Sequence, residues 1–201
     1  MSGVAPGEGA ETGPVLATPR LLLRLAGRAD VPAIVGHLEE NWAHLAPSFP
    51  APPREFLTAA YWEARVEASR EEAARGGSLR LFVFPREEPG RVVGMVSFTD
   101  VSRGAAHSCA LGYGLAAAEQ GKGLMGEAVG AGIAHVFREM NLHRVTATYA
   151  AHNLRSGALL KRLGFTVEGY ARDYLRVGGR WEDHVLAALL NPAWRAGDPP
   201  P

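Results

Sequence analysis

The sequence predicts a mixed α/β fold in which a central sheet of antiparallel and parallel strands is flanked by helices. Apolar runs in the first half follow one another as antiparallel neighbours, whereas the second half alternates strand, helix, strand, helix and strand. The second order is typical of parallel crossovers. The chain has 201 residues, of which 47% are hydrophobic, and this suits one domain of ordinary size.

The first two elements follow from side-chain spacing and from helix signals. Leu21, Leu23 and Leu25 share one face of an extended segment, which predicts a strand over 20–25. Asp30 is suited to cap a helix that has Pro32 in its first turn, and this helix is expected to reach about residue 41.

A proline-rich loop, a second helix and a hairpin come next. Four prolines between residues 47 and 53 exclude a helix or a central strand there. Residues 54–75 are predicted to form a long helix that ends at Gly76-Gly77. Segments 79–84 and 91–98 are then predicted to pair as neighbouring strands.

The second half is predicted to contain two helices and four strands. Gly112 and Gly114 interrupt the first of these strands, which indicates a bulge or a close backbone approach. Gly178-Gly179 can supply the positive φ of a tight hairpin turn. The predicted segments are a strand at 107–115, a helix at 124–140, a strand at 144–149, a helix at 153–163, and hairpin strands at 165–177 and 181–190.

Charge and cysteine content exclude several classes of protein. The 21 Lys and Arg residues balance 21 Asp and Glu residues, so no overall basic field favours nucleic acid or an anionic membrane. Cys109 is the one cysteine, which excludes an intrachain disulfide and fits a reducing compartment; its apolar surroundings predict a buried side chain. No apolar run is long enough to span a membrane, so we expect a soluble, cytoplasmic protein.

Both ends of the chain are predicted to lie outside the folded domain. Residues 1–17 are rich in Gly, Ala and Pro and lack the basic and apolar regions of a signal peptide, so they are expected to be a disordered extension. The domain is predicted to cover 18–190, and 191–201 to form a C-terminal tail.

A glycine-rich stretch at 118–128 lies between a predicted strand and a predicted helix. Gly121 and Gly123 flank Lys122, so the backbone can take strained angles and approach a ligand closely. The helix start offers unpaired N–H groups and the positive end of its dipole, which predicts an anion site, most naturally for a pyrophosphate. The P-loop pattern fails because Gly123 stands where it requires Ser or Thr, and the G-x-G-x-x-G spacing is absent.

Residues 18–190 resemble the GNAT acetyltransferases, and most closely their RimJ/RimL group, which acetylates the N-terminal amines of ribosomal proteins. The glycine-rich stretch is similar to the family's Gln-x-x-Gly-x-Gly/Ala loop through Gln120 and Gly123, with Met125 at its last position. The segments that carry the resemblance are EENWAHLAPSFP (39–50), LGYGLAAAEQGKGLMGEA (111–128), NLHRVTATYAAHNLRSGALLKRLGF (141–165) and EGYARDYLRVGGRWEDHVLAALL (168–190).

This resemblance implies an acyl-CoA N-acyltransferase fold with a splayed central sheet and acetyl-CoA as cosubstrate. Pantetheine would pair with the backbone of the fourth strand, and a strand N–H would bind the oxyanion. The residues alone leave alternatives open: Asn153 would serve as a helix cap with or without a contact to pantetheine, and Lys122 would be a solvated loop lysine if it makes no contact with phosphate. The residues implied to contact the cofactor are Gly114, Leu115, Gln120, Gly121, Lys122, Gly123, Leu124, Met125 and Asn153.

The chemistry implied is direct attack of a neutral amine on the thioester. Ser156 stands where relatives carry tyrosine or serine near the sulfur, so it is assigned as donor to the leaving thiolate; a small residue in a first helical turn is the alternative. A peptide α-amine has a pKa of about 7.7–8.0, against about 10.4 for lysine, so a modest base acting through water suffices. Asp173 is the predicted base, with Glu168 and Asp183 as alternatives.

The acceptor is expected to lie near Glu40, Asn41, Asp183 and the proline-rich loop. The resemblance implies that it is the N-terminal alanine of a small-subunit ribosomal protein. No nucleic-acid or membrane partner is predicted, and a homodimer is left open. The seven histidines show no H-x-x-x-H or H-E-x-x-H ligand set, so no metal is predicted.

Two other functions remain open at this point. One is acetylation of a small-molecule amine such as an aminoglycoside or a polyamine, whose protonated amine would need a stronger carboxylate pocket. The other is a ribosome-assembly or acyl-CoA-binding protein with weak catalysis. Substrate identity varies readily within one fold, so the fold alone does not decide between them.

Overall fold

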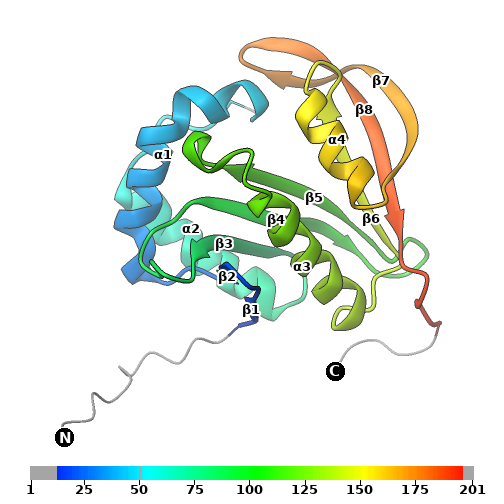
Figure 1. The fold of residues 1–201 in the computed structure, drawn as a ribbon, viewed down its shortest axis with the longest axis horizontal. Helices are drawn as coiled ribbons and strands as arrows, with labels where there is room; N and C mark the ends of the chain where they lie inside the picture. Colours follow the sequence, from blue (N-terminus) through cyan, green and yellow to red (C-terminus); the bar gives the residue numbers. More distant parts are fainter. Residues whose placement is uncertain (1–12, 50, 197–201) are drawn as a thin grey trace, which may run out of the picture.

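The computed structural model describes residues 13–49 and 51–196, which fold around an eight-stranded sheet with the order β1-β2-β3-β4-β5-β6-β8-β7 (Figure 1). The strands are β1 (Val15–Ala17), β2 (Leu21–Arg24), β3 (Leu79–Pro85), β4 (Gly94–Ser102), β5 (Ser108–Leu115), β6 (Arg144–Ala150), β7 (Thr166–Val177) and β8 (Arg180–Leu190). The helices are α1 (Val31–Leu45), α2 (Ala59–Ala74), α3 (Leu124–Arg138) and α4 (Leu154–Arg162), with short 3-10 turns η1 (Arg28–Asp30), η2 (Ala46–Ser48) and η3 (Ala117–Glu119).

The sheet is mixed, as the sequence predicts. Strands β1 to β5 pair antiparallel in chain order, and β5 then pairs parallel with β6. That parallel pair needs a long crossover, which α3 provides. β8 lies between β6 and β7 and is antiparallel to both. The predicted turn between β7 and β8 is confirmed, since Gly178 and Gly179 have φ values of 56° and 84°.

Helices cover both faces of the sheet because successive side chains of a strand point to opposite faces. Val129 and Val136 of α3 are buried in the core cluster on one face. On the other face, Trp62 of α2 packs with Phe82 and Phe84 of β3. Figure 1 shows α3 and α4 in front of the sheet and α2 behind it. The sheet therefore separates two hydrophobic clusters, one on each of its faces.

The helix α2 (Ala59–Ala74) begins five residues after the predicted start at 54. Thr58 caps it, and its hydroxyl accepts a hydrogen bond from the Tyr61 N–H at 3.3 Å. The preceding residues are held by Phe56, whose carbonyl accepts a 2.7 Å bond from Trp62 Nε1. The ring of Phe56 also packs against that of Trp42, with centroids 5.1 Å apart. Tertiary packing therefore fixes the segment that follows the proline-rich loop in a non-helical form.

Both ends of the described chain contain structure that the sequence analysis did not predict. Val15–Ala17, which were assigned to the N-terminal extension, form β1 and pair with β2. Residues 1–12 of that extension lie outside the described residues. At the other end, Asn191 is buried and donates to the Leu142 carbonyl at 3.0 Å, and the Trp194 ring lies against His143. The start of the predicted tail is therefore packed onto the domain.

The glycines in β5 allow a close approach rather than a bulge. Pairing with β4 runs without interruption from Gly94–Leu115 to Thr99–Ala110, and the irregularity falls farther along β4, between Thr99 and Ser102. A Cβ on Gly114 would lie 3.1 Å from the ring of Phe49. Of the two predicted alternatives, close packing against the backbone is confirmed.

Two other expectations concern the core and the membrane. Cys109 is buried, and this burial raises the pKa of its thiol to about 12, as expected for an unreactive side chain. Within 13–49 and 51–196, no helix combines the length and the apolar character that a membrane span requires.

Candidate active site

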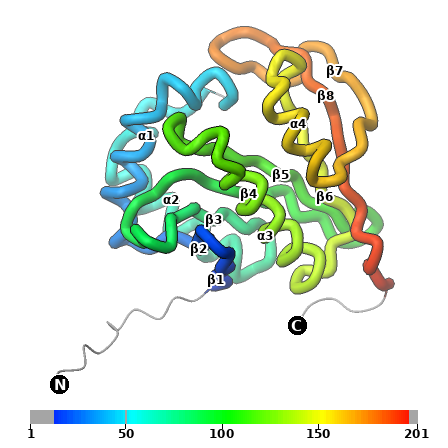
Figure 2. The backbone as a smooth tube through the Cα atoms, viewed as in Figure 1, coloured from blue at the N-terminus to red at the C-terminus, as the bar shows by residue number. Residues whose placement is uncertain are grey.

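The parallel strands β5 and β6 diverge after a short paired stretch. Ser108–Leu111 pair with Arg144–Ala147, whereas β5 continues to Leu115 and β6 to Ala150. The backbone after β5 turns toward α1, and β6 leads to α4 (Figure 2). No strand of the described chain pairs with residues 112–115 on the β6 side. This is the splayed sheet that the sequence analysis expects, and an extended ligand arm can pair with such a free edge.

A cluster of main-chain N–H groups lies where β5 passes into α3. Gly121 and Gly123 have φ values of 76° and 77°, and Gly123 is the N-cap of α3. Among the described residues, the N–H groups of residues 121–126 have no hydrogen-bond acceptor. The side chains of Leu124 and Met125 are buried in the core, so these residues present their backbone. Together with the helix dipole, this arrangement suits an anion.

The charged side chains around this loop are paired with one another. Lys122 Nζ lies 2.9 Å from Glu119, which Arg91 also contacts at 3.0 Å. Hydrogen bonds from Lys122 and Arg91 hold the pKa of Glu119 below its usual value. Lys122 is thus an exposed loop lysine whose ammonium group pairs with Glu119. Its predicted contact with phosphate stays a prediction.

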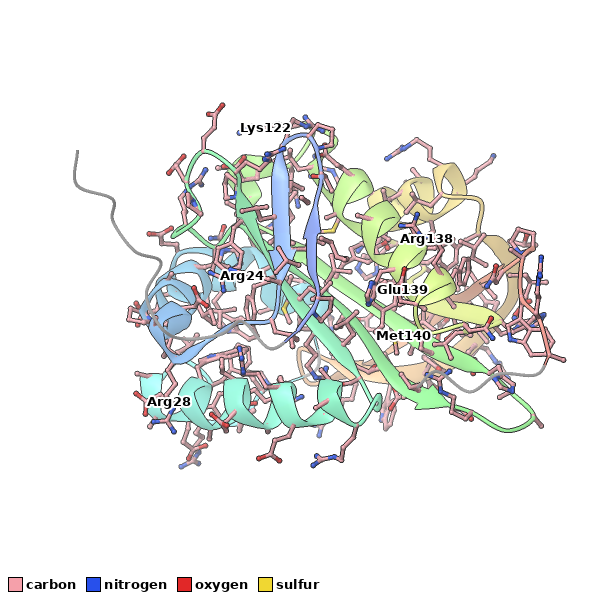
Figure 3. The ribbon with its side chains drawn as sticks, turned by 90° about the horizontal axis from the view of Figure 1, so that it is seen from below. Arg24, Arg28, Lys122, Arg138, Glu139 and Met140 are labelled. Atoms are coloured by element: carbon pink, nitrogen blue, oxygen red, sulfur yellow. The ribbon has the colours of Figure 1, made fainter. Side chains whose placement is uncertain are left out.

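Arg20 is a residue of this loop environment that the sequence analysis did not identify. Its Nη1 donates to the Lys122 carbonyl at 2.8 Å, and its Nε donates to Glu127 at 2.7 Å. Figure 3 shows Lys122 beside the turn between β1 and β2, which brings Arg20 to the loop. No local pattern could reveal this contact, because the partners are about a hundred residues apart in sequence.

Gln120 uses its side-chain amide to link two helices. Its Nε2 lies 2.7 Å from Nε2 of His44 in α1, and its Oε1 accepts a hydrogen bond from Arg155 in α4. An amide nitrogen only donates, so His44 accepts through the unprotonated Nε2. The first residue of the loop motif therefore connects α1 and α4 across the opening between β5 and β6.

Ser156 and Asn153 occupy the first turn of α4, beside this opening. Asn153 Oδ1 accepts from the Ser156 N–H at 3.1 Å, so its predicted role as a helix cap is confirmed. Its contact with pantetheine stays a prediction. Ser156 Oγ lies 2.6 Å from the hydroxyl of Tyr113 in β5, a second residue that the sequence analysis did not identify.

Gly114 and Leu115, predicted to pair with pantetheine, lie on the free part of β5. Leu115 directs its side chain into the core and is 8% exposed. Gly114 presents its backbone, because Phe49 and Leu45 fill the space where a Cβ would stand. A ligand could therefore contact β5 at Gly114 and Leu115 only through their main-chain N–H and C=O groups.

The predicted acceptor residues Glu40 and Asn41 differ in environment. Glu40 is exposed on α1. Asn41 is buried; its Oδ1 accepts from the Ala117 N–H at 3.0 Å, and its Nδ2 donates to the His37 carbonyl at 2.9 Å. Asn41 thus fixes η3, which leads into the loop, and its predicted contact with an acceptor stays a prediction.

The three candidate bases lie on the hairpin of β7 and β8. The turn η2, at the start of the proline-rich loop, contacts β7 and so lies next to this hairpin. Glu168 pairs with Arg144 at 2.7 Å. Asp183 accepts from Tyr170, and this bond holds the pKa of Asp183 below its usual value. Asp173 is exposed at a break in the strand register, with φ of 46°, and its backbone N–H donates to Asp183. Within the described chain, Asp173 alone of the three has no side-chain partner.

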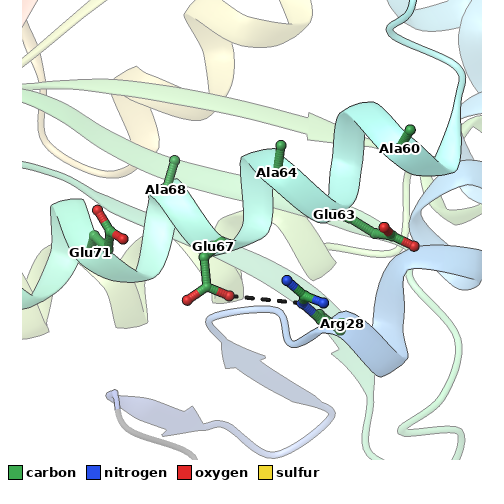
Figure 4. Close-up of a pocket in the computed structure, with 7 residues that line it drawn as sticks. All are labelled: Arg28, Ala60, Glu63, Ala64, Glu67, Ala68 and Glu71. Carbon is green, nitrogen blue, oxygen red and sulfur yellow. Dashed lines mark ion pairs between the residues drawn. The ribbon is translucent and has the colours of Figure 1, made fainter.

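Neither a metal cluster nor the hollow beside α2 adds to this site. The described residues contain no group of three or more His, Cys, Asp or Glu side chains placed to hold a metal ion. A shallow hollow lies between Arg28 and the exposed side of α2, where alanines alternate with Glu63, Glu67 and Glu71 (Figure 4). None of its residues belongs to the loop or to the diverging strands.

Comparison with known proteins places this arrangement in a family. The family model described as acetyltransferase (GNAT) domain matches residues 20–166. The ribosomal protein uS5-alanine N-acetyltransferase of Escherichia coli strain K12 is 40% identical over 182 residues, covering 90% of this chain and 93% of that protein.

Solved structures agree with this result. The ribosomal-protein-S5-alanine acetyltransferase of Vibrio fischeri has a TM-score of 0.86 at 32% identity, covering 90% of this chain and 98% of that one. Mycobacterium smegmatis RimJ, solved with CoA-disulfide, has a TM-score of 0.79 at 29% identity, with 89% and 85% covered. The chain therefore belongs to the GNAT acetyltransferases.

Proposed function

We propose that this protein transfers the acetyl group of acetyl-CoA to the N-terminal α-amine of ribosomal protein uS5, at alanine. The observation that carries the proposal is the 40% identity to the E. coli uS5-alanine N-acetyltransferase along nine-tenths of both chains. The geometry of the site is consistent with it, because a free strand edge and an anion-binding helix start lie next to each other.

Donor binding would use main-chain groups. The N–H groups of Gly121, Gly123 and Met125, with their neighbours in the loop, would bind the pyrophosphate. The pantetheine amides would pair with the backbone of residues 112–115, as an added strand does. The amide of Asn153 retains free donors after its oxygen has capped α4, and these could reach the same arm.

Chemistry would proceed by direct attack. The α-amine attacks the thioester carbonyl, a β5 N–H stabilises the oxyanion, and Asp173 takes the amine proton through a water. The difference of about 2.5 pKa units between an α-amine and lysine corresponds to roughly 3.5 kcal/mol that the enzyme need not supply for an N-terminal acceptor. One exposed carboxylate is therefore sufficient as a base.

The test is intact-mass measurement of uS5 incubated with acetyl-CoA and this protein, followed by mapping of the modified residue. We expect one added acetyl group on the alanine α-amine. A uS5 sample with a chemically blocked N-terminus is the control and should gain none. Acetylation only at lysines, or of a small amine but not of uS5, would contradict the proposal.

A further inference from the structure

A hydrogen bond connects β5 to α4, the helix that follows β6, beside the point where the two strands diverge. The hydroxyl of Tyr113 lies 2.6 Å from Oγ of Ser156. Tyr113 stands two residues beyond Leu111, the last residue of β5 that pairs with β6, and Ser156 is in the helix that follows β6. The bond therefore joins β5 to α4 next to the free part of the β5 edge, where the pantetheine arm of the proposed donor would end.

The chemistry of the two hydroxyls indicates which of them donates. Burial raises the pKa of the Tyr113 phenol, so the phenol keeps its proton at neutral pH. A phenol is a stronger acid, and hence a better donor, than the aliphatic hydroxyl of serine. Ser156 Oγ has no further hydrogen-bond partner in the described part of the chain. With Tyr113 as donor, the proton of Ser156 remains available to a ligand.

We propose that Tyr113 is a positioning residue: it donates to Ser156 and directs the serine proton into the opening, toward the sulfur that leaves. This inference rests on the proposed function, because it requires a CoA thioester in the site. It adds a residue from β5 to a role that the sequence analysis gave to Ser156 alone.

The pair acts by hydrogen bonding and transfers no proton. A thiol has a pKa of about 8.5 and a phenol about 10, so moving the phenol proton to the thiolate would be uphill. When the C–S bond breaks, the sulfur leaves as a thiolate that accepts a hydrogen bond from Ser156. The thiolate then takes its proton from solvent, and Ser156 and Tyr113 keep theirs.

The first turn of α4 is fixed independently of Tyr113. Asn153 caps it through the Ser156 N–H. Gly157 packs on Tyr149 of β6 so closely that a Cβ there would lie 2.9 Å from the ring. Loss of the Tyr113 hydroxyl should therefore leave α4 in place and release only the orientation of the Ser156 hydroxyl.

The first test measures the pKa of the coenzyme A thiol bound to the protein, from the ultraviolet absorbance of the thiolate as a function of pH. A donor aimed at the sulfur favours the charged form, so the bound thiol should titrate below free coenzyme A. Tyr113→Phe and Ser156→Ala should each raise that pKa toward the free value. The double variant should match Ser156→Ala. Tyr149→Phe, which removes a neighbouring phenol with no hydrogen bond in the described chain, should match wild type.

The second test is a kinetic double-mutant cycle with an N-terminal alanine peptide. Each single variant should lower kcat about three- to tenfold, as expected for one neutral hydrogen bond, with little change in the KM for acetyl-CoA. Since Tyr113 acts only through Ser156, Tyr113→Phe should have no further effect in the Ser156→Ala background.

The outcomes separate this inference from the proposed function. Additive losses in the double variant, a changed KM alone, or Tyr113→Phe with wild-type kcat and thiol pKa would overturn the positioning role. A lowered thiol pKa in a protein that acetylates no alanine peptide would support the pair and count against the proposed acceptor. A protein that does not bind coenzyme A would refute both.

Discussion

Arg20 and Glu127 form an ion pair at the start of α3, with Nε of the arginine 2.7 Å from Oε2 of the glutamate. The Arg20 backbone N–H also donates to Oε1 of Glu127 at 2.9 Å. A carboxylate in the first turn would repel a pyrophosphate bound at the same helix end. Arg20 offsets this charge, so the loop amides and the helix dipole remain favourable to an anion.

Replacing Arg20 by glutamine should weaken coenzyme A binding. With the charge of Glu127 no longer balanced by a guanidinium, we expect the Kd from calorimetry to rise about three- to tenfold, and more at low salt than at high salt, because the interaction is electrostatic and the Arg20 side chain is half-exposed. Arg86→Gln is the matched control, since Arg86 is exposed and bonds the carbonyl of Thr18 in the same turn without touching the loop. Equal affinities for the two variants at low salt would contradict this role.

The sequence predicted the features that depend on local geometry. The glycine-rich loop is an example, because two positive-φ glycines before a helix constrain the backbone whatever surrounds them. The strand–helix alternation likewise predicted the parallel β5–β6 pair. The residues and elements that determine these features are neighbours along the chain.

The features that the sequence did not predict arise from long-range packing. Arg20 reaches Glu127, and Tyr113 reaches Ser156, only because the sheet order places β2 and β5 beside helices that come later. A start of α2 at 54 was wrong for a similar reason, since Phe56 is held out of the helix by Trp42 and Trp62. Nothing within a short window of sequence specifies such partners.

A carboxylate placed inside the loop should act against the anion directly. Gly123 has φ of 77°, which aspartate tolerates better than most residues, so Gly123→Asp should fold. We expect the calorimetric Kd for acetyl-CoA to rise by about tenfold or more through repulsion at the helix start. Gly104→Asp, at φ of 56° in an exposed turn with open space around it, should bind as wild type. Unchanged affinity in Gly123→Asp would refute the loop assignment.

Substitutions of Asn153 can separate its confirmed capping role from its proposed contact with the cofactor. Asn153→Ala should lose about 1 kcal/mol of unfolding free energy, because the Ser156 N–H loses its acceptor. Asn153→Ser restores that acceptor but lacks an amide. If the amide also binds pantetheine, the serine variant should regain stability in thermal unfolding and still show a raised KM for acetyl-CoA. Recovery of both properties would leave Asn153 a cap only.

The pH dependence of catalysis can test Asp173 as the base. At pH 6 the α-amine, with a pKa of about 7.7–8.0, is mostly protonated, whereas at pH 9 it is mostly neutral. Asp173→Asn should therefore lower kcat/KM more at pH 6 than at pH 9. Asp183→Asn, which removes the carboxylate charge beside Tyr170, should give a loss that is similar at both values. A uniform loss in Asp173→Asn would remove it as the base.

The stability of the α2–β3 region should depend on pH through Glu72. Hydrogen bonds from Ser78, and to a lesser degree from Arg65, hold the pKa of Glu72 at about 2, against 4.5 in its unperturbed state. Because the folded-state pKa is depressed, the stabilisation is present above about pH 4.5 and is lost as the pH falls toward 2.

Glu72→Gln should accordingly lower the unfolding free energy at pH 7 by about 1–2 kcal/mol, a value reduced for solvent screening because Glu72 and Arg65 are about a third exposed. Glu71→Gln is the matched control one residue away; its pair with Arg75 is exposed and should contribute no more than about 0.5 kcal/mol.

Urea unfolding of both variants at pH 7 and pH 3 measures the effect. The difference between Glu72→Gln and wild type should narrow at pH 3, because the unfolded wild-type carboxyl is then protonated and draws the equilibrium toward unfolding. A difference that stays constant with pH would mean that Glu72 stabilises the fold by packing and not by its charge.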